Sequence, residues 1–141
     1  MSELSPVYLS AIAAQLGGLS AFLGGFAATF LVMLMGLSGR GRAASFAIGF
    51  AASSAVAFIV AVVASTGLVA VLHPEAPGMV AATPSGGARV LMTLAFLLGL
   101  YSLLFSLALS GWARSKGTGW TTSIAAGLGV VLVTSMLVGI G

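Results

Sequence analysis

Two long runs without an ionisable side chain constrain this chain more than any other feature. Between Glu3 and Arg40 the only ionisable side chain is that of Tyr8, and residues 43–72 contain none. Each run exceeds the roughly 20 apolar residues that a helix needs to cross the hydrocarbon of a bilayer. Charged residues make up 5% of the chain, whereas a soluble domain carries roughly a quarter. The chain is therefore expected to fold in a membrane.

Two further apolar stretches follow the first pair, so the sequence predicts four membrane-spanning helices. The runs are apolar at every position, which favours helices over the alternating strands of a membrane β-barrel. The predicted fold class is an all-α, four-helix integral membrane subunit, which we expect to form a symmetric homo-oligomer. Residues 1–141 would form a single membrane domain, with spans at about 6–37, 43–72, 88–112 and 118–140.

The basic residues predict how the chain is oriented. Four of the five lie in two short connections on one side of the membrane, at 38–42 and 113–117: Arg40, Arg42, Arg114 and Lys116. Only Arg89 lies on the other side. Because short cytoplasmic loops are enriched in Lys and Arg, these two connections are expected to be cytoplasmic and both termini to face outward. We expect the membrane to be a bacterial-type inner, or plasma, membrane.

Small side chains follow one stripe along each of the first two spans. On the first span they recur at spacings of four and three, at Ser10, Ala14, Gly17, Ala21, Gly24 and Ala28. On the second span they recur every fourth residue, at Gly49, Ser53, Ala57, Ala61 and Ser65. Such stripes let helix backbones approach closely in lipid. They predict helix packing, either within one bundle or between subunits.

A second face of the first span combines polar and bulky side chains. At 100° per residue a narrow arc contains Gln15, Phe22, Phe26, Thr29 and Met33. Repeated around a symmetry axis, this face would line a narrow path with an amide ring, two aromatic constrictions, a hydroxyl ring and a thioether ring. The alternative is that Gln15 bonds to a neighbouring helix while the aromatic rings pack inside the monomer or against lipid.

The stretch from Ser20 to Ala28 resembles the first transmembrane helix of the Orai calcium-release-activated calcium channels, which also have four spans per subunit. The second span ends in Val71-Leu72-His73-Pro74-Glu75, which is similar to the end of that family's second helix. The resemblance implies that Gly25 is a hinge, that Phe26 is a hydrophobic gate, and that Phe22 and Thr29 are pore positions.

The sequence also departs from the Orai pattern. Met33 stands where the family has its selectivity glutamate, so the resemblance does not imply calcium selectivity. The basic pore mouth that precedes the family's first helix is missing here. That family also keeps its termini in the cytosol, whereas the basic residues of this chain predict outward termini.

Several classes of function are disfavoured by residues that the chain lacks. Neither acid, Glu3 or Glu75, lies within a span, which argues against a proton- or cation-coupled exchanger. The chain has no cysteine and a single histidine, His73, so we expect no metal site, no cofactor and no enzymatic activity. Five scattered basic residues are too few for a nucleic-acid interface.

Three hypotheses of function remain from the sequence. The first is an oligomeric pore or ion channel, in which the first span lines the path and phenylalanine side chains form a hydrophobic gate. The second is a non-conducting structural or accessory subunit that packs against a larger membrane-protein partner. The third is a transporter of small neutral solutes. The expected partners are the lipid bilayer, further copies of the chain and, under the second hypothesis, that larger protein.

Overall fold

The computed structural model of the chain describes residues 5–36, 41–81 and 84–140. The elements in chain order are α1 (Pro6–Gly36), α2 (Arg42–Leu72), α3 (Gly78–Ala81), α4 (Gly86–Arg114) and α5 (Lys116–Ile140). The described residues are all-helical, and four of these helices are long and apolar enough to cross a membrane, as an integral membrane protein requires. Most of the predicted connection at 38–42, including Arg40, lies outside the described residues.

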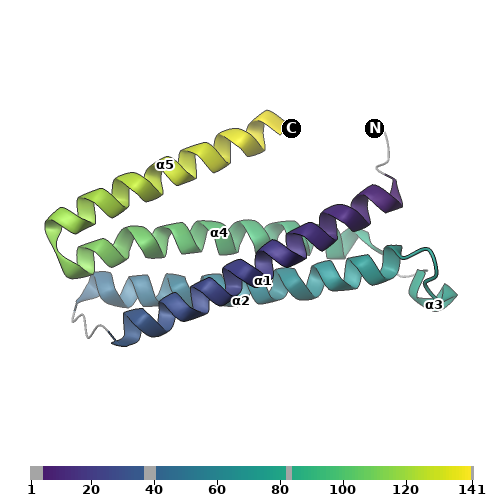
Figure 1. The fold of residues 1–141 in the computed structure, drawn as a ribbon, viewed down its shortest axis with the longest axis horizontal. Helices are drawn as coiled ribbons and strands as arrows, with labels where there is room; N and C mark the ends of the chain where they lie inside the picture. The colour runs from purple at the N-terminus through teal and green to yellow at the C-terminus, as the bar shows by residue number, and fades with distance from the viewer. Residues whose placement is uncertain (1–4, 37–40, 82–83, 141) are drawn as a thin grey trace.

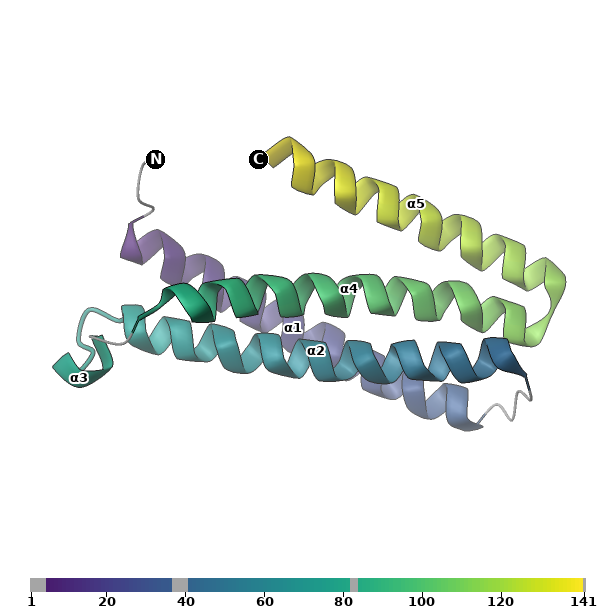
Figure 2. The ribbon, with the colours of Figure 1, turned by 180° about the vertical axis from the view of Figure 1, so that it is seen from behind.

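The helices form an open bundle around an antiparallel central pair, α2 and α4 (Figures 1 and 2). α1 runs diagonally across the pair and packs mainly on α2, whereas α5 packs on α4 alone and diverges from it toward the C-terminus. The buried share of the most apolar stretch is 39% in α2 and 33% in α4, against 11% in α1 and 6% in α5. α2 and α4 therefore form the core of the subunit.

Phe58 is the centre of the contact between α2 and α4. Its side chain is fully buried, and its ring packs edge-on against that of Phe96 with the centroids 6.1 Å apart. An added Cβ at Gly99 would lie 3.0 Å from ring atoms of Phe58, so a glycine at this position lets the ring lie against the α4 backbone. From the other side Gly24 of α1 approaches the Cβ of the same phenylalanine. One aromatic side chain thus joins three helices.

Two buried hydrogen bonds add polar contacts between the central helices. The Ser54 hydroxyl of α2 donates to the Gly99 carbonyl at 2.8 Å, and the Ser106 hydroxyl of α4 donates to the Ala47 carbonyl at 2.7 Å. Each bond satisfies a hydroxyl that would otherwise lie unpaired in a medium without water. The central pair is therefore held by packing and by hydrogen bonds in both directions.

The connection between α4 and α5 is shorter than the 113–117 loop predicted from the sequence. Only Ser115 lies between the two helices. Its backbone is extended, its N–H donates to the Gly111 carbonyl at the end of α4, and its Oγ accepts the Thr118 N–H at 3.2 Å at the start of α5. One serine therefore caps both helices, so no longer loop is needed.

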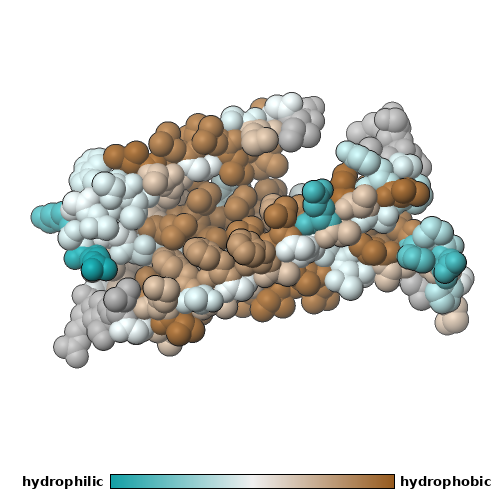
Figure 3. All heavy atoms as spheres, in the orientation of Figure 1, coloured by the Kyte–Doolittle hydropathy of each residue, from teal (hydrophilic) through white to brown (hydrophobic). Residues whose placement is uncertain are grey.

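The connection between α2 and α4 contains the short helix α3. The surface of the bundle matches a lipid environment. Hydrophobic residues cover most of the middle of the face in Figure 3, while hydrophilic residues gather mainly toward its ends. Large apolar side chains are exposed on every long helix, for example Phe22, Val63, Leu98 and Leu132.

Candidate functional site

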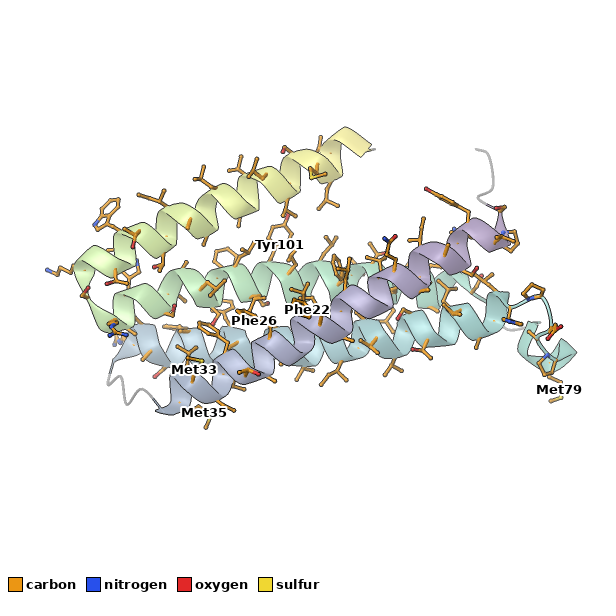
Figure 4. All side chains as sticks on the ribbon, viewed as in Figure 1. Phe22, Phe26, Met33, Met35, Met79 and Tyr101 are labelled. Carbon is orange, nitrogen blue, oxygen red and sulfur yellow. The ribbon has the colours of Figure 1, made fainter. Side chains whose placement is uncertain are left out.

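The face predicted to line a path lies on the exposed side of α1. Phe22, Phe26 and Met33 have 73%, 48% and 59% of their surface exposed, and Gln15 and Thr29 are exposed as well. Figure 4 shows Phe22, Phe26 and Met33 one after another along this helix. The residues that α1 buries, Ala13, Ser20 and Ala27, recur every seven residues on a different side of it. The candidate face therefore lies away from the side by which α1 packs in the described subunit.

Two contacts within α1 stabilise part of this face. The rings of Phe26 and Phe30 are nearly parallel, with centroids 6.2 Å apart and an interplanar angle of 5°. The Thr29 hydroxyl donates to the Gly25 carbonyl of the same helix at 2.9 Å. The Thr29 hydroxyl proton is therefore engaged in this bond, while the hydroxyl oxygen can still accept a hydrogen bond or contact a cation. Phe30 was not among the residues predicted for this face.

Gly17 and Gly24 lie in the contact between α1 and α2. An added Cβ on Gly17 would lie 2.5 Å from the Ser65 Oγ, and one on Gly24 would lie 3.2 Å from the Phe58 Cβ. Gly25 differs from both, because an added Cβ there would meet no other side chain or distant backbone within 4 Å. Gly17 and Gly24 permit close approach of α1 and α2. Gly25 makes no such contact and lies beside the candidate face.

The small stripe that α1 uses for packing is displaced from the stripe expected on sequence grounds. Ala14, Ala21 and Ala28 are exposed, and the contact with α2 is made by an adjacent row of residues: Ala13, Gly17, Ser20, Gly24 and Ala27. The expected stripe and the observed contact share Gly17 and Gly24, but the alanines of the expected stripe lie on a neighbouring, exposed side of α1. On α2 a similar displacement leaves Gly49 and Ser53 exposed, whereas Ala57, Ala61 and Ser65 are buried.

A second row of small residues on α1 remains exposed. It consists of Ala11, Ala14, Gly18, Ala21, Gly25 and Ala28, at alternating spacings of three and four. Added Cβ atoms on Gly18 and Gly25 would have open space around them. Another helix could approach the α1 backbone here as closely as α2 does on the packed side. We call these six residues the exposed small row.

The subunit does not enclose a path by itself. α1 and α5 make no contact in the described part of the chain, so α5 does not cover the candidate face. α5 is held to α4 partway along by Tyr101, whose hydroxyl lies 2.8 Å from the Thr134 hydroxyl. A closed path lined by α1 would therefore require further copies of the subunit or another protein.

Sequence reasoning missed a cavity at the end of the bundle where α1 and α4 finish and α2 and α5 begin. Phe30 and Leu34 of α1 line it together with Ser110 and Arg114 of α4 and Thr118 and Thr122 of α5. These residues come from separate helices and share no local motif. The available signal was the combination of Trp112, Arg114 and Trp120 with three hydroxyl side chains around one helix connection.

Comparisons with known proteins give no match: no protein-family model, no curated protein and no solved structure matches this chain. The class that the described helices define is a membrane protein with four potential spans.

Proposed function

We propose that this chain is the subunit of a homo-oligomeric membrane channel in which α1 of each copy lines the path. The observation that carries the proposal is the exposed face of α1. An amide, two phenylalanines, a hydroxyl and a thioether share this face, and none of them makes a hydrogen bond or ring contact to another helix of the described subunit. In a ring of copies, these side chains would supply a polar entrance, a hydrophobic constriction and oxygen ligands in turn.

The exposed small row supports the oligomeric part of the proposal. Neighbouring subunits need α1 helices that approach closely, and Gly18 and Gly25 leave room for such an approach. The row lies beside the candidate face, so a contact along it would turn that face toward the axis of a ring. The likeness of Ser20 to Ala28 to the first Orai helix supports the same register, with Phe26 as the gate.

Phe26→Ser tests the gate against a closely matched control. Loss of the ring would let water enter the constriction, so ion flux into liposomes should rise above that of the wild type. The control is Phe105→Ser, because Phe105 lies at a similar fraction of the length of α4, is 51% exposed, and also has a ring partner, Phe50. Equal flux in both variants, or no flux in either, would overturn the channel proposal.

Single cysteines provide a second test, because the natural chain contains none. A water-soluble thiol reagent should reduce flux through Phe26→Ser protein that also carries Gln15→Cys. The same reagent should leave flux unchanged when the Phe26→Ser protein carries Val131→Cys instead. Val131 is 63% exposed but lies on α5, away from the proposed path. Sensitivity at both positions, or at neither, would contradict a path along α1.

A non-conducting accessory subunit is the second candidate, and the exposed small row favours it as well. A helix of a larger membrane protein could dock on Gly18 and Gly25 in place of a second copy. Crosslinking in native membranes through Gly18→Cys separates the two candidates. A homodimer band supports the channel, whereas a reproducible product with one larger protein supports the accessory role.

A further inference from the structure

We infer that the cavity at the basic end of the bundle binds the headgroup of an anionic phospholipid, with a polyol headgroup such as that of phosphatidylglycerol. The cavity has a volume of about 430 Å³. That volume falls in the range of roughly 300–1,000 Å³ typical of small-molecule sites. This inference does not depend on the channel proposal, since it concerns a different part of the subunit.

Among the described residues that line the cavity, Arg114 has the only charged side chain. The single acid among the described residues, Glu75, follows the end of α2 and therefore lies at the opposite end of the bundle. The charge of the guanidinium is thus not balanced by any nearby carboxylate of the described chain. A guanidinium binds phosphate through two parallel hydrogen bonds, which makes a phosphate group its matching partner.

The tryptophans place the cavity at the level of lipid headgroups. Trp112 and Trp120 pack at the same helix connection with ring centroids 6.3 Å apart, and the Trp112 indole N–H donates to the Ser123 hydroxyl at 2.8 Å. Tryptophan side chains concentrate at the membrane–water interface. Basic pockets between helices at this level bind acidic headgroups. A lipid phosphate would therefore lie at the depth of Arg114.

The remaining lining explains why the ligand is a lipid and not a free anion. Phe30 and Leu34 of α1 give the cavity an apolar wall in addition to the arginine. Inorganic phosphate gains nothing from such a wall, whereas the glycerol backbone and the first methylene groups of a lipid chain would be removed from water against it. A second cavity, between α2 and α4, has no charged residue among its described lining residues and offers nothing to a phosphate.

The hydroxyl groups favour a polyol headgroup. The Ser110 hydroxyl donates to the Leu107 carbonyl at 2.8 Å, and the Thr122 hydroxyl donates to the Thr118 carbonyl at 2.9 Å. Since their protons are engaged, these oxygens are available as acceptors. Phosphate oxygens cannot donate to them, but the free hydroxyls of a glycerol headgroup can. The site therefore pairs a phosphate-binding cation with acceptors for alcohol groups.

The wall formed by α4 and α5 is fixed by close packing. A Cβ on Gly111 would collide with the Thr122 Oγ1 and would lie 2.7 Å from the Thr118 carbonyl oxygen. The two helices are therefore in direct backbone contact beside the cavity. The backbone positions of Arg114 and Thr122 relative to one another are set by this contact before any lipid binds.

Fluorescence quenching by brominated lipids tests the inference, because both tryptophans of the chain lie at this connection. The full chain is placed in phosphatidylcholine vesicles that contain a small fraction of brominated phosphatidylglycerol or of brominated phosphatidylcholine. We expect stronger quenching by the brominated phosphatidylglycerol. Arg114→Gln should abolish this difference. Lys116→Gln should retain it, because Lys116 is an exposed cation two residues away that does not line the cavity.

Thermal unfolding in detergent distinguishes the possible ligands. Short-chain phosphatidylglycerol should raise the melting temperature of the wild type and of Lys116→Gln but not that of Arg114→Gln. Short-chain phosphatidic acid should raise it less, since its headgroup has no glycerol hydroxyls. An equal rise with inorganic phosphate or phosphatidylcholine, or equal loss in the two variants, would overturn the proposed site. Circular dichroism of each variant checks that the helices are intact.

Discussion

The Ser106 hydroxyl of α4 donates a 2.7 Å hydrogen bond to the Ala47 carbonyl of α2, and both residues are fully buried. The acceptor is a backbone carbonyl of α2. Ser106 therefore joins the two helices although no polar side chain of α2 takes part. Together with the bond from Ser54 to Gly99, it fixes the relative register of the central pair.

Ser106→Ala should destabilise the bundle without changing its fold. The variant loses one interhelical hydrogen bond, which in membrane proteins contributes on average about 0.6 kcal/mol and at most about 1.7 kcal/mol. The free energy of unfolding in mixed micelles of detergent and dodecyl sulfate measures the change. Ser135→Ala is the control, because the Ser135 hydroxyl bonds only to the Leu132 carbonyl of its own exposed helix. An equal loss in both variants would contradict the role of the bond.

Gly99→Ala should bring a methyl group against the ring of Phe58. The added carbon would lie 3.0 Å from ring atoms, so the ring or the helix must move. Overpacking of this kind costs about 1–3 kcal/mol of unfolding free energy. Phe58→Leu in the same chain removes the ring atoms that collide, so the double variant should lose less than the sum of the single losses. Additive losses would show that collision with the Phe58 ring is not the reason why Gly99→Ala is unfavourable.

Gly17→Leu should separate α1 from α2, because the added side chain must enter the space occupied by Ser65. We expect a loss of about 1–3 kcal/mol in unfolding free energy and faster proteolysis of α1. Gly49→Leu is the matched control, since Gly49 is exposed on α2 and has open space around an added Cβ. Unchanged stability of Gly17→Leu would contradict the contact described for this glycine.

Tyr101→Phe should loosen α5. The variant removes the hydroxyl that bonds to Thr134, so amide hydrogens in the C-terminal half of α5 should exchange faster with solvent deuterium. Thr134→Val should have the same effect, and the double variant should add little to either. Tyr8→Phe, at the exposed start of α1, should leave exchange in α5 unchanged.

The long helices were predictable because the signal for a membrane span is an unbroken apolar run. The bounds of α1 and α2 lie within one residue of the predicted spans, whereas α4 and α5 extend two residues further into their connection at Arg114 and Lys116. That extension depends on Ser115 capping both helices, which composition does not reveal.

The packed side of α1 was harder to predict than its existence. Small residues occur on two neighbouring rows of this helix, and periodicity alone does not say which row has a partner. The choice is made by Phe58 and Ser65 of α2, which come against Gly24 and Gly17. The cavity was missed for a related reason: its lining is assembled from separate helices around one arginine.

The position of α2 and α4 at the centre has a consequence for biosynthesis. A ribosome delivers α1 and α2 to the membrane before the residues of α4 exist, at roughly 5–20 residues per second. During that interval the Ala47 carbonyl has no hydroxyl from α4, and Ser54 has no Gly99 to bind. The first hairpin must therefore enter the bilayer held only by the contact between α1 and α2, and the third long helix then completes the core of the subunit.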